Sequence, residues 1–232
     1  MYSGGRGVTF SISARCPRTG MFGIAVASSS VCVAARCGVW VRAGAGVVAT
    51  QNITDPRLGA LGLELLARGY SAKAVIDELV TSNAHPEYRQ LAVVDQDGRT
   101  AHFSGAKTLG AHRVAEGAGC VAAGNLLASD AVPEKMVAAL LAAPDERLAE
   151  RLVQALEAGL AAGGEEGGVR SAGLYVVDRH VFPIADLRVD WHEEPIAELR
   201  RLWTVYEPQM ADYLTRAIDP AAAPSYGVPG DT

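Results

Sequence analysis

Aromatic residues are scarce in this sequence: Phe, Trp and Tyr together make up 6% of its 232 residues. Since 49% of the residues are nonetheless hydrophobic, we expect a core built mainly from Ala, Val and Leu. No apolar run reaches the roughly 18 residues that a membrane-spanning helix requires. The sequence therefore predicts a large aliphatic core and no membrane partner.

Charge is also limited, with 20% charged residues and a net charge of −5. The basic residues are scattered, which argues against a nucleic-acid partner. The four cysteines form no CxxC pair and have no His at the spacing of a zinc site, so we expect reduced thiols and no metal. The first residues lack the apolar segment of a secretory signal, and we expect a cytoplasmic protein.

Nucleotide-binding motifs are missing as well. The glycine runs at 44–46 and 117–119 both lead into apolar strands, whereas a dinucleotide fingerprint lies between a strand and a helix. The chain contains no GxxxxGK[ST]. We therefore expect no cofactor.

What is present is a strand with an unusual polar face. Residues 8–14 alternate, with Thr9, Ser11 and Ser13 on one side and apolar residues on the other. A turn then leads into residues 21–30, which are typical of an antiparallel return strand. The hydroxyls indicate either a solvated edge strand or one wall of an active-site cleft.

A second polar group, Thr50, Gln51 and Asn52, arrives at the end of another predicted strand. Strand ends are common places for ligand-binding side chains, so these residues are candidates for a site lining. The alternative is a turn in which the Asn and Thr side chains bond nearby backbone.

Periodicity and turn residues predict the remaining elements in chain order. We expect helices over 55–68, 71–80, 132–143, 146–162 and 192–216, and strands over 87–95, 99–104, 117–123, 172–178 and 186–190. Hairpins outnumber βαβ units, which favours an α+β fold of antiparallel sheets with helices on their outer faces. We expect an N-terminal extension over 1–8, a single domain over 9–218 and a disordered tail over 219–232.

Several stretches, read together, resemble one bacterial family, domain of unknown function 1028 (DUF1028), placed in the N-terminal nucleophile (Ntn) hydrolase superfamily. The matching phrases include TFSISAR, TGMFGIAVASSS, VRAGAGVVATQN, YRQLAVVDQDGR, VRSAGLYVV and DLRVDWHEEPIAELRRL, in order from Thr9 to about Leu202. The resemblance implies a four-layer αββα sandwich, in which two antiparallel sheets lie between outer helix pairs.

The resemblance also implies a mechanism. In the superfamily, the first residue of the mature chain attacks an amide carbonyl, and its own α-amino group acts as the base. Carried over, the nucleophile is Thr9, which here follows eight residues, so a free amine requires a cut between Val8 and Thr9. Many relatives have Lys where this chain has Ser30.

The hypothesis is a hydrolase of a non-peptide C–N bond, an amide, carbamoyl or cyclic amide, in a small molecule. Ser11 is the fallback nucleophile, and Asn125, after a buried strand, is the candidate oxyanion donor. Arg42 and Arg170 are candidates to bind a substrate carboxylate, or else form ion pairs with Asp55 or Glu165. The remaining candidates are the polar lining residues Ser30, Gln51, Asn52 and Ser171.

Two other functions fit the same residues. The chain could be a non-catalytic small-molecule-binding protein that keeps the hydrolase scaffold, or a hydrolase that uses Ser11 or Ser29 with the chain uncut. We also expect a homo-oligomer, because the predicted C-terminal helix carries Trp203, Val205 and Tyr206 and can bury an apolar patch against a second copy.

Overall fold

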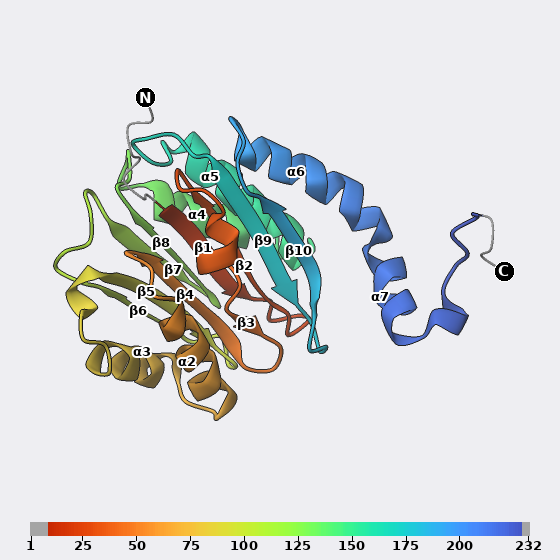
Figure 1. The fold of residues 1–232 in the computed structure, drawn as a ribbon, viewed down its shortest axis with the longest axis horizontal. Helices are drawn as coiled ribbons and strands as arrows, with labels where there is room; N and C mark the ends of the chain where they lie inside the picture. Colours follow the sequence, from red (N-terminus) through yellow and green to blue (C-terminus); the bar gives the residue numbers. More distant parts are fainter. Residues whose placement is uncertain (1–8, 229–232) are drawn as a thin grey trace.

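A computed structural model describes residues 9–228. The predicted extension over 1–8 and the last four residues of the predicted tail lie outside the described residues. The fold is a mixed α/β arrangement with two antiparallel sheets (Figure 1). No helix in the described part of the chain combines the length and apolar character needed to cross a membrane.

The larger sheet has six strands, and β1 lies among its central strands. Its order is β10 (Pro183–Val189), β9 (Ser171–Val177), β2 (Phe22–Ser28), β1 (Thr9–Arg15), β8 (Cys120–Asn125) and β7 (Arg113–Gly117). The smaller sheet has the order β3 (Val41–Arg42), β4 (Gly46–Asn52), β5 (Arg89–Asp95) and β6 (Thr100–Ser104). Neighbouring strands are antiparallel throughout, as the hairpin-rich sequence predicts.

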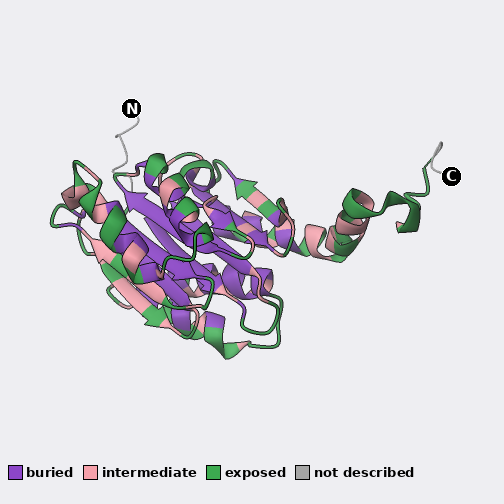
Figure 2. Ribbon diagram, turned by 90° about the horizontal axis from the view of Figure 1, so that it is seen from below, coloured by how far each residue is buried: buried purple, intermediate pink, exposed green. Residues whose placement is uncertain are grey.

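Each sheet contacts helices on one face and the other sheet on its opposite face. The helices on the six-stranded sheet are α4 (Val132–Ala142), α5 (Leu148–Ala161) and α6 (Pro195–Tyr206). Those on the four-stranded sheet are α2 (Pro56–Ala67) and α3 (Ala72–Thr81). A third apolar cluster, which includes Phe22, Ile24, Val47 and Val94, lies between the sheets. Burial is therefore concentrated in both sheets (Figure 2).

The alternation of β1 decides which core each side chain enters. Phe10, Ile12 and Ala14 join the core beneath α4 and α5. Ser11 and Ser13, on the opposite face, are 2% and 0% exposed. Burial of these hydroxyls excludes the solvated-edge interpretation, and β1 presents its polar face to the smaller sheet.

Capping residues begin two helices where the sequence indicates. The side chain of Asp55 accepts a hydrogen bond from the backbone N–H of Arg57, and Pro56 occupies the first helical position of α2. Ser71 does the same for α3 by accepting from the N–H of Ala74. Both caps use donors that the first helical turn leaves unpaired.

Several elements differ from the sequence-based prediction. The helix predicted over 192–216 is divided into α6 and α7 (Met210–Ile218) by a 3-10 turn, Glu207–Gln209, which contains Pro208. The strand predicted over 117–123 begins only at Cys120, as β8, because Ala118 and Gly119 form a turn, with Gly119 at φ 71°. The strand before this turn, β7, was not expected. A short helix, α1 (Val33–Cys37), was not expected.

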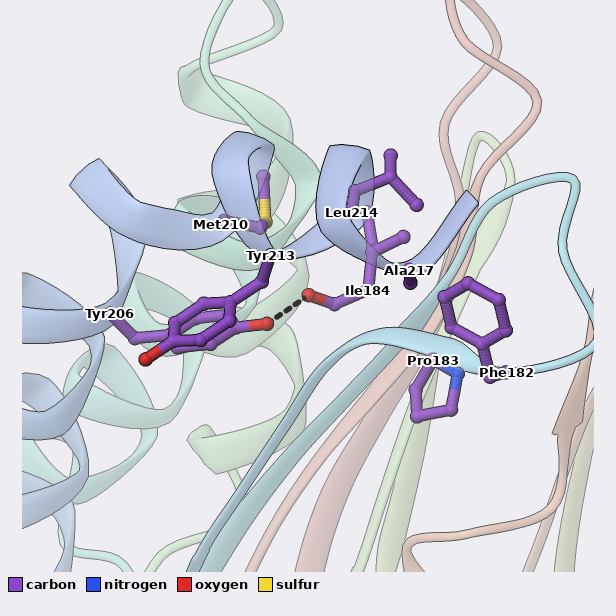
Figure 3. A pocket seen from close by; sticks show the side chains of 8 residues that line it. All are labelled: Phe182, Pro183, Ile184, Tyr206, Met210, Tyr213, Leu214 and Ala217. Atoms are coloured by element: carbon purple, nitrogen blue, oxygen red, sulfur yellow. Dashed lines mark hydrogen bonds between the residues drawn. The ribbon is translucent and has the colours of Figure 1, made fainter. Parts of the chain in front are cut away.

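The C-terminal arm, defined as residues 207–222, extends from the end of α6 away from the sheets (Figures 1 and 2). Tyr206 stacks on Tyr213 with ring centroids 5.8 Å apart, and its hydroxyl donates to the carbonyl of Ile184 at 2.8 Å (Figure 3). A mostly apolar pocket of about 380 Å³ separates the arm from β10. The expectation that Trp203 contributes to an exposed patch is wrong, because this residue is 1% exposed and packs in the core.

Candidate functional site

Four polar side chains form a row across one end of the six-stranded sheet. Thr9 lies opposite both Ser28 and Asn125, and Ser28 lies opposite Ser171. Residues directly opposite in neighbouring strands point to the same face of a sheet. The polar row, Ser171, Ser28, Thr9 and Asn125, therefore presents three hydroxyls and one amide to the same side.

Hydrogen bonds connect most of the polar row to the loop that follows β2. The hydroxyl of Thr9 donates to Ser28 Oγ at 3.3 Å, and this oxygen also accepts the N–H of Ser30 at 3.0 Å. Ser171 Oγ donates to the carbonyl of Ser30 at 2.5 Å and accepts the N–H of Val33 at the start of α1. The loop and α1 are thereby positioned by the strands.

A pocket of about 290 Å³ opens at Thr9. Its polar lining includes Thr9, Ser28, Ser30, Arg36, Asn52 and Thr54. Arg36 belongs to α1 and is exposed, and it has no ion pair within residues 9–228. Sequence reasoning missed Arg36 as a site residue, because only the unexpected helix α1 brings it to Thr9. The pocket thus brings Thr9 and the positive charge of Arg36 to the same cavity.

A buried amide network lies next to the polar row and connects the two sheets. Ser11 Oγ donates to Gln51 Oε1 at 2.6 Å, and Gln51 Nε2 donates to Gln90 Oε1 at 2.8 Å. Asn125 Nδ2 donates to the same Gln90 oxygen at 3.1 Å. Gln90 Nε2 in turn donates to the carbonyl of Gly124 at 3.0 Å. Gln90, which sequence reasoning also missed, fixes the orientation of the two predicted site amides.

The structure places Ser11 and Gln51 behind the pocket rather than in its wall. Both are at most 2% exposed, and neither lines the pocket beside Thr9. Ser11 lies two residues further along β1 than Thr9, and its hydroxyl donates a hydrogen bond to Gln51 Oε1. These two residues connect the two sheets next to the site. Asn125 and Ser171 are likewise buried, at 0% exposed, and neither is part of the pocket lining.

Asn52 fits both of the roles that the sequence left open, a lining residue of the site and a turn residue whose side chain bonds nearby backbone. It lines the pocket and has a left-handed φ of 71° at the end of β4. Its side chain donates to the carbonyl of Tyr88 at 2.7 Å and accepts the N–H of Leu109 at 3.2 Å. Its side-chain amide therefore connects two neighbouring loops, and the residue also lines the pocket.

Arg42 is not brought together with the other candidates. It pairs with Gly46, which is six residues before Asn52 on β4 and thus roughly 20 Å from it. The suggested ion pair between Arg42 and Asp55 is also wrong: Asp55 pairs with Arg57 at 2.8 Å, which lowers the pKa of its carboxyl.

Arg170 lies at the edge of the site. Its backbone N–H donates to the carbonyl of Ser28 at 2.8 Å, next to the polar row. Its guanidinium pairs with the carboxylate of Glu193 at 3.0 Å and also donates to that residue's carbonyl. A substrate carboxylate would have to compete with Glu193 for this group.

Glu165 is an unexpected buried acid near the polar row. It is 6% exposed, and neither carboxyl oxygen makes a full hydrogen bond with any described residue. Burial raises the pKa of Glu165 to about 7, although Ser29 and the positive charge of Arg170 oppose the rise. Its backbone forms an isolated antiparallel bridge with Leu127.

The four cysteines are unpaired thiols. Cys37 lies in the wall of the pocket, 3.3 Å from the hydroxyl of Thr54. Burial raises the pKa of the Cys37 thiol, which disfavours the thiolate needed for nucleophilic attack. No cluster of three or more His, Cys, Asp or Glu suited to a metal ion occurs within residues 9–228.

Comparisons with protein families and with solved structures both give matches. A family model described as "Family of unknown function (DUF1028)" matches residues 9–199, a range that begins at Thr9. The structure is similar to the crystal structure of protein SPO2555 from Silicibacter pomeroyi, which is described with the same family model. The two share 31% sequence identity with a TM-score of 0.79, over 89% of this chain and 93% of that chain. No curated protein matches.

Proposed function

The chain belongs to the DUF1028 family of unknown function, and on the geometry around Thr9 we propose that it hydrolyses a non-peptide C–N bond in a small molecule. Thr9 is the nucleophile once the chain is cut between Val8 and Thr9. The observation that carries the proposal is that the Thr9 hydroxyl lines a pocket while Ser28 and Asn125 flank it in strand register. These are the positions that a nucleophile and a polarising neighbour require.

The proposal includes the architecture of the Ntn hydrolases. Two antiparallel sheets that pack together, each with helices on its outer side, support a four-layer αββα sandwich of that type. The position of Thr9 at the start of a central strand supports the same assignment. In such a fold the strand itself aims the first residue, so little reorganisation precedes the reaction.

The proposed reaction begins with the α-amine exposed by the cut. Its ordinary pKa near 8 leaves an appreciable neutral fraction at pH 7, which can accept the Thr9 hydroxyl proton as Oγ1 bonds to the carbonyl carbon. The tetrahedral intermediate then collapses, its C–N bond breaks, and the ammonium returns the proton to the leaving nitrogen. Water hydrolyses the resulting ester by the reverse proton path and restores the Thr9 hydroxyl.

Asn125 is the proposed donor to the developing oxyanion. One hydrogen of its amide goes to Gln90, which leaves the second to donate toward the carbonyl attacked by Thr9. A donor of this kind contributes on the order of 3 kcal/mol to the transition state. Because Gln90 fixes the amide, its geometry is set before the substrate binds.

The positive charge in the pocket indicates the substrate class. Arg36 shares the pocket with Thr9 and is available for a carboxylate, which suits N-acyl or N-carbamoyl amino acids. This role replaces the one that the sequence suggested for Arg42, which belongs to β3 and pairs with the first residue of β4, far from Thr9. We further propose that the enzyme acts in the cytoplasm, where its thiols stay reduced.

The test is a hydrolysis assay combined with the intact mass of the chain. The protein, with and without residues 1–8, is incubated with N-acyl and N-carbamoyl amino acids. We expect turnover only when Thr9 is the first residue, loss of turnover in Thr9→Ala and partial retention in Thr9→Ser. Turnover by a chain whose mass includes residue 1 contradicts the mechanism.

The second candidate function is a small-molecule-binding protein. It is favoured by Ser30, which lines the pocket where many relatives have Lys and leaves that position without a charge. Thermal-shift measurements with the same compounds distinguish the two functions. A binder is stabilised by a compound that it leaves chemically unchanged.

A further inference from the structure

The carboxyl group of Glu165 is buried and has no partner at hydrogen-bond geometry among the described residues, although Ser29 lies close enough to lower its pKa. Burying an ionisable group without a partner costs several kcal/mol, so such groups are uncommon and are often tied to function. The proposed mechanism described above does not use Glu165. Its position therefore requires an explanation.

Glu165 lies just beyond the start of β1. On one side its backbone pairs with Leu127, two residues past Asn125 on the extension of β8. On the other side its carboxyl lies beside Ser29, one residue past Ser28 at the end of β2. Asn125 and Ser28 are the two cross-strand partners of Thr9. Glu165 contacts residues that are one and two positions beyond these partners. Measured along the strand direction, it therefore lies roughly 3 to 7 Å from Thr9.

Asn125 supplies a second acceptor at the same level. Its Oδ1 atom is buried and has no hydrogen-bond partner in the described part of the chain, although its Nδ2 is held by Gln90. Asn125 is the direct cross-strand partner of Thr9. Two buried acceptors therefore flank the start of β1: Asn125 Oδ1, and the carboxyl of Glu165, whose nearby donors belong to Ser29. A group with several N–H donors would satisfy both.

We propose that Glu165 is a positioning residue that binds the α-ammonium group of Thr9 in the cut chain, with Asn125 Oδ1 accepting a second N–H from it. The proposal rests on the proposed function, because only a cut before Thr9 creates this amine. When the amine takes the Thr9 hydroxyl proton, the carboxylate stabilises the positive charge that forms. A carboxylate beside a catalytic imidazolium has the same role in Ser-His-Asp sites.

In the uncut chain the ionisation of Glu165 is expected to differ from that in the cut chain. There Thr9 N is a neutral amide, and the charged group that influences Glu165 is Arg170. The new ammonium would add an opposite charge within direct contact, which favours the ionised carboxylate and the protonated amine together. Cutting the chain is therefore expected to lower the pKa of Glu165, and the ionised carboxylate is expected to raise the pKa of the new amine.

The experiment measures both titrations without any substrate. Full-length protein carrying a protease recognition sequence within residues 1–8 is folded first and then cut so that Thr9 becomes the first residue. Side-chain 13C NMR follows Glu165 before and after the cut, and 13C-dimethylation of the α-amine follows its titration. We expect the pKa of Glu165 to fall by two units or more on cutting.

Glu165→Gln is expected to lower the pKa of the Thr9 α-amine by about one unit in the cut protein. Glu166→Gln is the matched control, because Glu166 is the next residue, carries the same charge and is exposed. An amine titration that is the same in wild type and Glu165→Gln overturns the proposal. If Glu165→Gln does not fold, an unchanged Glu165 titration after the cut of wild type overturns it equally.

Failure of this inference is separate from failure of the proposed function. Coupled titrations without any hydrolysis support the ammonium site and count against the enzyme. Hydrolysis that depends on Thr9, with no coupling between Glu165 and the amine, retains the enzyme and rejects the role of Glu165.

Discussion

At the scale of single residues, the site depends on buried polar groups that satisfy one another between apolar layers. Gln90 is the centre of this network, since its oxygen accepts from both Gln51 and Asn125. A buried donor that loses its partner costs about 1–3 kcal/mol, because water cannot replace the lost bond. The network should therefore be among the most sensitive parts of the molecule to substitution.

Gln90→Leu is expected to lower the free energy of unfolding by about 2–4 kcal/mol, because it leaves the amides of Gln51 and Asn125 without their acceptor. Urea denaturation measures the change. Gln96→Leu is the control, as Gln96 is exposed in the turn after β5. Equal stability of the two variants would show that the network contributes little.

The ionisation of Glu165 predicts a pH dependence for the uncut chain. Its folded pKa of about 7 is above the ordinary value of about 4.5, so the folded state binds more protons between these values. The free energy of unfolding is therefore highest below pH 4.5, as far as this group is concerned. It falls by on the order of 3 kcal/mol as the pH rises through 7. Denaturation between pH 5 and 8 should show this slope, and Glu165→Gln should flatten it. If the free energy of unfolding of Glu165→Gln depends on pH as strongly as that of the wild type, other groups cause the dependence.

At the scale of elements, close packing against strands positions the helix that borders the pocket. A Cβ built on Gly173 in β9 would lie 2.4 Å from the Cβ of Ala34 in α1. A real side chain there must push α1 outward, and α1 carries Arg36 into the pocket. Gly173 thus affects the site without lining it.

Gly173→Ala is expected to destabilise the protein by about 1–3 kcal/mol, the usual cost of overpacking a well-filled interior. A ligand that binds beside Thr9 should also bind more weakly, because Arg36 moves with α1. Thermal denaturation and ligand titration measure the two effects. Gly167→Ala is the control, since no atom lies within 4 Å of its built Cβ. Full stability of Gly173→Ala would show that α1 is loosely held.

Periodicity and capping residues predict most elements, and long-range assembly accounts for what they miss. The alternation of β1, the Asp55 and Ser71 caps and the hairpins all act over a few residues, so the sequence reveals them. The break at Pro208 is also local, but the apolar spacing on both sides of it favours one helix. Arg36, Gln90 and Glu165 gain their roles only when distant strands pair, and no nearby spacing marks them.

At the scale of the whole molecule, the C-terminal arm is largely exposed, although Met210 and Leu214 pack against the main core. None of the residues of α7 is buried, and Tyr213 and Ile218 are 44% and 56% exposed. Its apolar pocket faces β10 (Figure 3). Val205, near the end of α6, is 54% exposed. An apolar surface on an extended arm is typical of an interface between copies of one chain.

We expect the protein to sediment as a dimer or larger homo-oligomer at micromolar concentration. The double variant Val205→Glu with Ile218→Glu should dissociate it, because two charges then enter the buried interface. Val181→Glu is the control, as this fully exposed residue lies outside the arm. A monomeric wild type in sedimentation velocity would remove the arm from consideration as an interface.

The polar row draws one residue from each of four strands, and those residues span the chain from Thr9 to Ser171. A nascent polypeptide therefore has no complete polar row until β9 has left the ribosome, and the activity proposed above requires the row to be complete. A cut before Thr9 that depends on the complete polar row can occur only after about three-quarters of the chain has been synthesised, roughly the share that ends at Val177.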